Sequence, residues 1–253
     1  MHVIERGTGT PVVLLHGFGV DHHILLPLDH TFAGWRRLYV DLPGSGRTPI
    51  GDVASTQDVV RVVTDEIKRR VGDRPFAIVG NSFGGIVARH VAHELREQVI
   101  GLAILAGVFI AEHGRRTVPP KTVLVTDPTT TGGEDYAELA VVQSEANARA
   151  FIDHVQPGLR AADSEGLARV AARYSLDREP EDVWPEPFDR PCLVVTGRQD
   201  HVVGYSDAWA QLEHYPRATF VTLDAAGHNV HLDRPSVVDA LLADWLERVT
   251  ADQ

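Results

Sequence analysis

A serine flanked by glycines is the first feature of this sequence that could do chemistry. The stretch GNSFG (residues 80–84) is the single Gly-x-Ser-x-Gly match, and it stands between an apolar run and a helical pattern. A sharp strand-to-helix turn of this kind holds a serine hydroxyl clear of the backbone. A phosphate loop requires a Lys and a dinucleotide loop a different glycine spacing, so neither fits. We predict that Ser82 is a nucleophile, with a plain tight turn as the alternative.

A serine nucleophile needs a base, and the base needs a carboxylate that orients it. Two strand-like runs supply both groups: Asp200 follows CLVVTG, and His228 follows FVTLD in a loop of small residues. Their order along the chain, serine then acid then histidine, suits a parallel sheet whose strands end at one edge. We expect Ser82, Asp200 and His228 to form a catalytic triad. Asp224 and His231 are the alternatives for the acid and the base.

The tetrahedral oxyanion of such a reaction needs two backbone N–H donors. Phe83 follows the nucleophile at the start of a helix, and we predict its N–H as one donor. The other donor is predicted to be Phe18 N–H, in the sequence HGFG (residues 16–19) that follows the run PVVLL. An ordinary turn is the alternative for HGFG. Asp41 and Arg47, in DLPGSGRT, are expected to brace a loop near this site.

Elements that would position these residues alternate between strand and helix patterns. Strands are predicted for residues 2–6, 11–16, 36–41, 75–81, 99–107, 191–197 and 217–224, and helices for 55–71, from 82 onward, 205–215 and 235–249. This alternation predicts an α/β fold, with a mostly parallel sheet of about seven or eight strands and helices on both faces. Ser55 and Asp58 predict a capping box at the first of these helices.

Residues 109–190 break this rhythm and read as an insertion into a core domain made of residues 1–108 and 191–253. The insertion has many prolines, an isolated apolar run at 122–126, and helical patterns near 134–154 and 163–174. Polar residues of the insertion that could face a substrate pocket are Tyr136, Gln143, Asn147 and His154.

Taken together, the motifs HGFG, DLPGSGRT, GNSFGG, TGRQD and GHNVHLDRP resemble those of the α/β-hydrolase fold enzymes, in order and rough spacing. The resemblance covers residues 1–108 and 191–250. It implies a hydrolase without a cofactor, in which residues 109–190 form a mainly helical cap over Ser82. GNSFGG is also similar to the branch that cleaves carbon–carbon bonds in ring-fission products. That branch usually has Trp after its catalytic histidine, whereas this chain has Asn229.

Composition excludes several other classes of protein. Lys and Arg number 24 against 35 Asp and Glu, and the basic residues are scattered, so we expect no nucleic-acid partner. No apolar run approaches the ~18 to 20 residues of a membrane span, and no leader is evident, so we expect no membrane partner and a cytoplasmic protein. Cys192 lies in an apolar run and reads as a buried thiol. The paired histidines lack an accompanying acidic or thiolate pattern, so we expect no metal site.

These observations together predict a serine hydrolase that cleaves a small ester, thioester or lactone through an acyl-enzyme. Its partner would be a small-molecule substrate, and no cofactor is expected. The alternatives are a carbon–carbon bond hydrolase and a ligand-binding protein without activity on the same fold. The sequence predicts neither the substrate nor the oligomeric state.

Overall fold

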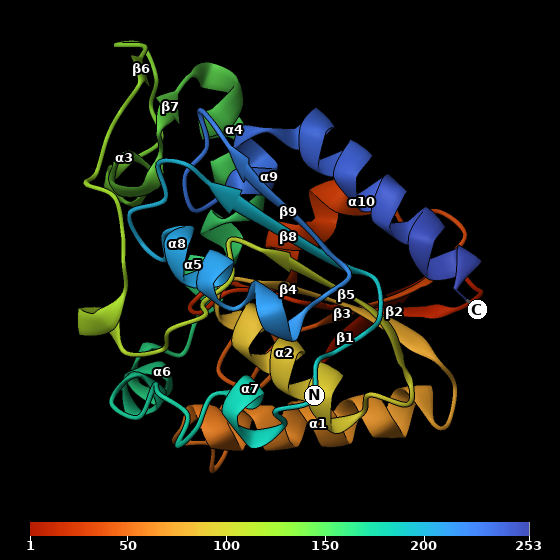
Figure 1. Cartoon of the computed structure of the whole chain (residues 1–253). Helices are drawn as coiled ribbons and strands as arrows, with labels where there is room; N and C mark the ends of the chain where they lie inside the picture. Colours follow the sequence, from red (N-terminus) through yellow and green to blue (C-terminus); the bar gives the residue numbers. More distant parts are fainter. Residues whose placement is uncertain (253) are drawn as a thin grey trace.

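A seven-stranded sheet forms the centre of the computed structural model, which describes residues 1–252 (Figure 1). The order across the sheet is β1-β3-β2-β4-β5-β8-β9; β1 runs antiparallel to β3, and every other pair is parallel. The strands are β1 (Val3–Arg6), β2 (Pro11–Leu15), β3 (Arg36–Val40), β4 (Phe76–Asn81), β5 (Val99–Leu105), β8 (Cys192–Gly197) and β9 (Ala218–Leu223). The predicted α/β fold with about seven or eight mostly parallel strands is confirmed.

The central strands are buried along their whole length because helices cover both faces of the sheet. Every residue of β2, β4 and β8 is buried, as continuous apolar runs in parallel sheets require. Helices α1 (Thr56–Val71) and α2 (Phe83–Glu94) lie on one face, and α10 (Pro235–Ala251) lies on the other (Figure 1). The predicted capping box begins α1, where Ser55 Oγ accepts a hydrogen bond from Asp58 N at 3.2 Å.

Shorter elements follow several strands at the edge of the sheet where the parallel strands end. They are η1 (His22–Leu28) after β2, α8 (Ser206–Ala210) and η3 (Leu212–His214) after β8, and α9 (Val230–Asp233) after β9. Within residues 1–252, no helix is long and apolar enough to cross a membrane.

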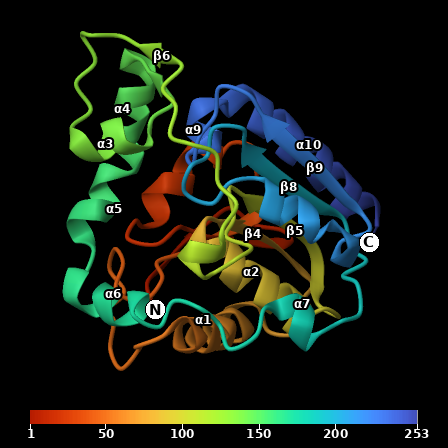
Figure 2. The same cartoon turned by 60° about the vertical axis from the view of Figure 1, so that its left-hand side comes forward.

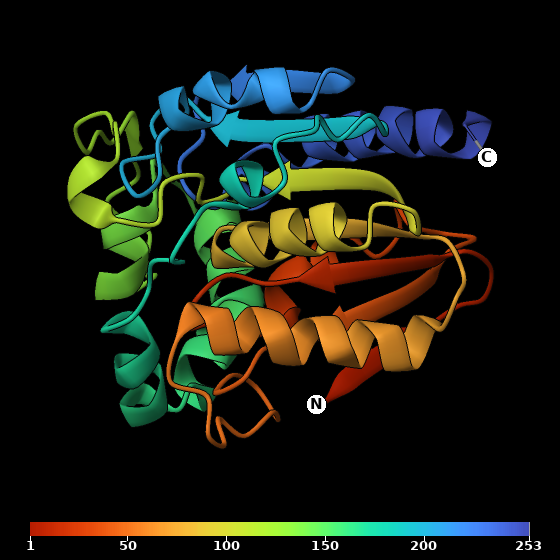
Figure 3. The ribbon, with the colours of Figure 1, turned by 60° about the horizontal axis from the view of Figure 1, so that its bottom comes forward.

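Residues 109–190, here called the intervening segment, leave the main sheet between β5 and β8. Figure 3 shows most of this segment beyond the arrowheads of the strands, and Figure 2 shows α3 to α6 along one side of the molecule. Its elements are η2 (His113–Arg115), β6 (Val125–Thr126), α3 (Glu134–Leu139), β7 (Val142–Gln143), α4 (Glu145–His154), α5 (Gln156–Ala161), α6 (Ser164–Ala171) and α7 (Pro180–Val183). Strands β6 and β7 form a separate parallel pair.

The helical pattern expected near 134–154 is interrupted in the structure. Residues 140–144 between α3 and α4 are not helical, and β7 occupies part of this stretch. Ser144 caps α4 by accepting a hydrogen bond from Asn147 N at 3.3 Å. A capping residue starts a new helix, which explains why one apparent periodic run became two helices.

Candidate active site

Ser82 occupies a strained turn between β4 and α2. Its backbone angles are φ 51° and ψ −117°, in a region that side chains other than glycine rarely adopt. The flanking glycines let the chain turn this sharply. A Cβ on Gly80 would lie 2.5 Å from Gly84 O, and a Cβ on Gly84 would lie 2.3 Å from Leu15 O. Backbone contacts therefore hold Ser82 at the end of β4, facing the other loops at this edge.

Ser82, His228 and Asp200 form one chain of hydrogen bonds. Ser82 Oγ lies 2.8 Å from His228 Nε2, and His228 Nδ1 lies 3.0 Å from Asp200 Oδ2. Asp200 is fully buried, and its other carboxylate oxygen accepts from Val202 N at 2.9 Å and Val203 N at 3.1 Å. The structure thus brings together the three side chains that the sequence analysis selected, from the loops after β4, β8 and β9.

The direction of these hydrogen bonds follows from their chemistry. An ionised Asp200 only accepts, so His228 Nδ1–H donates to it, and His228 Nε2 is left to accept from the Ser82 hydroxyl. An imidazole in this tautomer is able to take the hydroxyl proton as Oγ attacks an electrophile.

The alternative acid and base lie elsewhere. Asp224 is exposed and accepts a hydrogen bond from Gln199 Nε2 at 2.8 Å. His231 is fully buried, and its Nε2–H donates to Ile24 O at 2.8 Å, so the ring ties α9 to η1. Burial lowers the pKa of His231 to about 4, and its Nδ1 has no partner among the described residues. Neither side chain hydrogen-bonds to Ser82.

Phe18 and Phe83 carry the two backbone N–H groups that are predicted to bind the oxyanion. Within residues 1–252, neither residue's backbone N–H donates to a backbone acceptor. Phe83 is the first residue of α2, where the helix dipole favours negative charge. A Cβ on Gly17 would lie 3.6 Å from Ser82 Oγ, so the loop that carries Phe18 passes directly beside the serine.

Buried His16 holds this loop against the loop that follows β3. Its Nε2 accepts from Leu42 N at 2.9 Å, so the ring carries its proton on Nδ1, which donates to Gly17 O at 2.7 Å. Burial lowers the pKa of His16, and the neutral ring keeps one donor and one acceptor. His16 therefore fixes the position of the loop beside Ser82.

Aromatic rings from the core and the intervening segment meet next to these donors. The ring centroids of Phe18, Phe83 and Tyr174 lie 5.2 to 5.5 Å apart. Burial raises the pKa of Tyr174 to about 12, so its hydroxyl stays neutral. Leu167 and Val170 of α6 line a cavity of about 10 Å³ beside Phe18 and Phe83, room for about one water molecule. The sequence analysis missed these three residues of the intervening segment, because their apolar spacing marks only a buried helix face.

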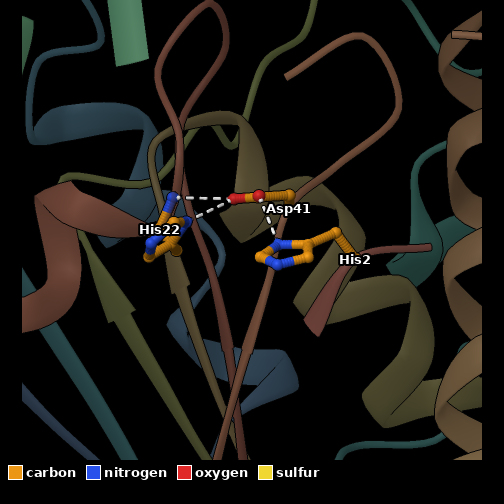
Figure 4. Close-up of side chains that lie close together, drawn as sticks. All are labelled: His2, His22 and Asp41. Carbon is orange, nitrogen blue, oxygen red and sulfur yellow. Dashed lines mark hydrogen bonds and ion pairs between the residues drawn. The ribbon is translucent and has the colours of Figure 1, made fainter. Parts of the chain in front are cut away.

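His2, His22 and Asp41 form a cluster of side chains that point toward one another (Figure 4). His22 Nδ1 is 2.7 Å from one oxygen of the Asp41 carboxylate, and His2 Nδ1 is 2.9 Å from the other. The backbone N–H groups of His22 and Arg47 donate to the same carboxylate, at 3.1 and 3.0 Å. Burial alone would raise the pKa of Asp41, but these hydrogen bonds hold it well below its usual value. Asp41 therefore braces three segments of chain, in line with the predicted bracing role.

In the structure, acidic side chains do lie next to the paired histidines His22 and His23, and Asp41 of this cluster is one of them. Asp21, His22 and His23 form a second group of potential ligand atoms, with Asp21 Oδ1 2.9 Å from His23 Nδ1. His2 and Asp41 are 39 residues apart, so sequence spacing could not reveal their contact. The Nδ1 atoms that would bind a metal already make hydrogen bonds to carboxylates, at distances typical of such bonds. The expectation that the chain has no metal site stays a prediction.

Comparisons with known proteins give the family. The alpha/beta hydrolase family model matches residues 12–241, most of the chain, so the protein belongs to this family and is a hydrolase. It is similar to a pimeloyl-(acyl-carrier protein) methyl ester esterase of Shewanella woodyi, 27% identical over 261 residues that cover 98% of each protein. It is also similar to the (E)-2-((N-methylformamido)methylene)succinate hydrolase of Acinetobacter baylyi, 24% identical over 97% of this chain and 94% of that protein.

The fold has close counterparts among solved structures. An alpha/beta superfamily hydrolase from Oenococcus oeni superimposes with a TM-score of 0.91 at 24% identity, covering 98% of this chain and 96% of that one. This likeness extends through the intervening segment as well as the sheet, because nearly the whole chain is covered.

Proposed function

We propose that the protein is a serine esterase that cleaves a small ester, thioester or lactone with Ser82, His228 and Asp200. One observation carries the proposal: a serine in a strained strand-to-helix turn, 2.8 Å from an imidazole whose other nitrogen faces a buried carboxylate. The esterase named among the similar proteins supports the same reaction class.

In the proposed reaction, Ser82 Oγ attacks the carbonyl carbon of the substrate while His228 Nε2 takes the hydroxyl proton. The carbonyl oxygen becomes an oxyanion, which accepts hydrogen bonds from the N–H groups of Phe18 and Phe83. The bond to the leaving oxygen or sulfur then breaks, and His228 returns the proton to that atom. Asp200 stabilises the imidazolium that exists between these two transfers.

The acyl group is now an ester of Ser82, and water removes it by the same route. His228 takes a proton from the attacking water, the Phe18 and Phe83 donors again hold the oxyanion, and Ser82 leaves with the returned proton. The products are a carboxylic acid and an alcohol or thiol, or from a lactone a single hydroxy acid, and the cycle needs no cofactor.

The intervening segment is proposed to be the cap of the site, over a core domain of residues 1–108 and 191–253. Support comes from Leu167, Val170 and Tyr174, which pack against Phe18 and Phe83 beside the proposed oxyanion hole. A cap of this kind would shape the acyl pocket with apolar side chains and exclude water from the developing charge.

Ester cleavage is preferred to the carbon–carbon cleavage that GNSFGG also suggests. The residue after His228 is Asn229, where that branch usually has Trp. A panel of p-nitrophenyl esters of increasing acyl length, assayed beside a vinylogous ring-fission diketone, distinguishes the two reactions. Turnover of the diketone faster than of every ester would replace our assignment with the carbon–carbon hydrolase.

Replacing Ser82 tests the nucleophile directly. We expect a fluorescent organophosphonate to label the wild-type protein and to leave Ser82→Ala unlabelled, with ester turnover lost by about 10⁴-fold or more. Ser236→Ala, which changes an exposed serine on α10, is the matched control and should label normally. Labelling of Ser82→Ala at the wild-type rate would place the nucleophile elsewhere.

A further inference from the structure

The loop that carries His228 rests on the intervening segment. A Cβ on Gly227 would lie 2.7 Å from Val141 Cγ2 and 3.2 Å from Leu139 O, so any larger residue there would have to displace Val141. Val141 is buried at this contact. The loop before His228 therefore packs against residues 139–141, at the end of α3 and just after it.

A single carboxylate joins the same loop to α4. Asp233, the last residue of α9, accepts from Gly227 N at 2.8 Å with one oxygen and from Asn147 Nδ2 at 2.7 Å with the other. Asn147 lies in the first turn of α4, 86 residues before Asp233. The side chain of Asp233 thus bridges the backbone next to His228 and a helix of the intervening segment.

Asp233 is mostly buried, so the stability of this bridge depends on the two hydrogen bonds that its carboxylate accepts. Burial raises the pKa of Asp233, and the hydrogen bonds from Gly227 and Asn147 act in the opposite direction. Charge-assisted hydrogen bonds of this kind are about twice as strong as neutral ones. Removing either donor would leave a mostly buried carboxylate oxygen without a partner, which is strongly unfavourable.

We infer that Asp233 and Asn147 form a latch through which the intervening segment sets the position of His228 relative to Ser82. Both are positioning residues, because neither contacts Ser82 or His228 by a hydrogen bond. The inference rests on the proposed roles of Ser82 and His228. Proton transfer depends on the 2.8 Å contact between Oγ and Nε2, and displacing a catalytic group by about 1 Å lowers rates by about 10²-fold.

Exchanging the two side chains tests the latch. Asn147→Asp places two carboxylates against each other, and at about pH 9 they hold no shared proton, so they repel. The double variant Asn147→Asp/Asp233→Asn restores both bonds. The amide oxygen introduced at position 233 accepts from Gly227 N, and the NH₂ of that amide donates to the carboxylate introduced at position 147. Ala146→Asp adds the same charge at the neighbouring exposed position of α4 and is the matched control.

We expect Asn147→Asp to slow organophosphonate labelling of Ser82, and kcat for a p-nitrophenyl ester, by about 10- to 100-fold with a smaller change in KM. The double variant should recover to within about threefold of wild type, and Ala146→Asp should match wild type. A general loss of folding would not be reversed by the exchange. Wild-type rates for Asn147→Asp, or a double variant as slow as the single one, would overturn the latch.

Amide hydrogen exchange separates this inference from the proposed function. Asn147→Asp should speed exchange in residues 139–147 and 224–233 together, and the double variant should restore protection in both. Absence of labelling at Ser82 in the wild-type protein would contradict the proposed function. The hydrogen-exchange measurement would still test the latch, because it does not depend on labelling. Faster exchange confined to α4 would show that the two regions are not coupled.

Discussion

The turn at Ser82 and the loop at His228 reach the same site by different means. The turn is held by backbone packing: Gly80 lets Gly84 O approach within the turn, and Gly84 lets Leu15 O approach from the neighbouring strand β2. The loop is held by side chains from distant parts of the chain: Asp200 lies 28 residues before His228, and Asn147 lies 86 residues before Asp233. The proposed nucleophile is thus positioned by close backbone contacts that its glycines permit, whereas the proposed base is positioned by side-chain hydrogen bonds from distant parts of the chain.

The largest effect on activity is expected from a substitution that removes the acceptor for His228 Nδ1–H but leaves the structure around His228 intact. In Asp200→Asn, the amide oxygen should keep the N–H donors of Val202 and Val203, which leaves its NH₂ facing His228 Nδ1. His228 must then carry its proton on Nε2, where it cannot accept from Ser82. We expect kcat for a p-nitrophenyl ester to fall by about 10⁴-fold.

Thermal unfolding and a matched variant complete this test. The unfolding temperature of Asp200→Asn should stay near that of wild type, since both oxygen-side hydrogen bonds are retained. Asp224→Asn changes the exposed alternative acid and should keep full activity. Full activity of Asp200→Asn would show that another group orients the base.

A smaller effect, now on folding, is expected from the turn at Ser82. Gly84→Ala would bring a methyl group to 2.3 Å from Leu15 O, so strand and helix must separate. We expect the free energy of unfolding to fall by about 3 kcal/mol, measured by urea titration. Gly114→Ala, where no atom lies within 4 Å of the added Cβ, should leave the midpoint unchanged. An unchanged midpoint for Gly84→Ala would contradict the backbone packing described for the turn.

The smallest effect is expected on the stability of the fold in acid. It comes from His231 in α9, the helix that follows the His228 loop. Unfolded His231 takes up a proton near its ordinary pKa of about 6.5, whereas burial lowers the folded value to about 4. Between these values the unfolded state binds more protons, so His231 destabilises the fold as the pH falls from about 6.5 to 4. The contribution of His231 to this loss in the free energy of unfolding is about 2 kcal/mol at pH 5.

Measuring the free energy of unfolding of wild type and of a His231 variant at two pH values isolates the contribution of His231. His231→Gln keeps a donor for Ile24 O and removes the titrating ring, so it should lose less stability than wild type between about pH 7 and 5. Other buried histidines with lowered pKa values, such as His16 and His93, titrate in both proteins and cancel in the comparison. Equal losses in the two proteins would show that His231 does not titrate in this range.

Much of the fold was predictable because its signals are local. Continuous apolar runs marked β2, β4 and β8, and the Ser55 cap marked the start of α1. The intervening segment was harder to predict, since α3 and α4 share one periodic pattern and only the cap at Ser144 separates them. A periodic pattern reports which residues are buried, not where one helix stops and the next begins.

The sequence by itself determined which residues meet at the site, because parallel strands end at one edge and the motifs follow those ends. Ser82, Asp200 and His228 were selected on that ground, and the structure places them within hydrogen-bonding distance. Only the tertiary structure decided what holds His228 in place. Asn147 looked like one polar helix residue among several, and its contact with Asp233 joins segments 86 residues apart. Such contacts depend on how the intervening segment packs against the core, which no local pattern specifies.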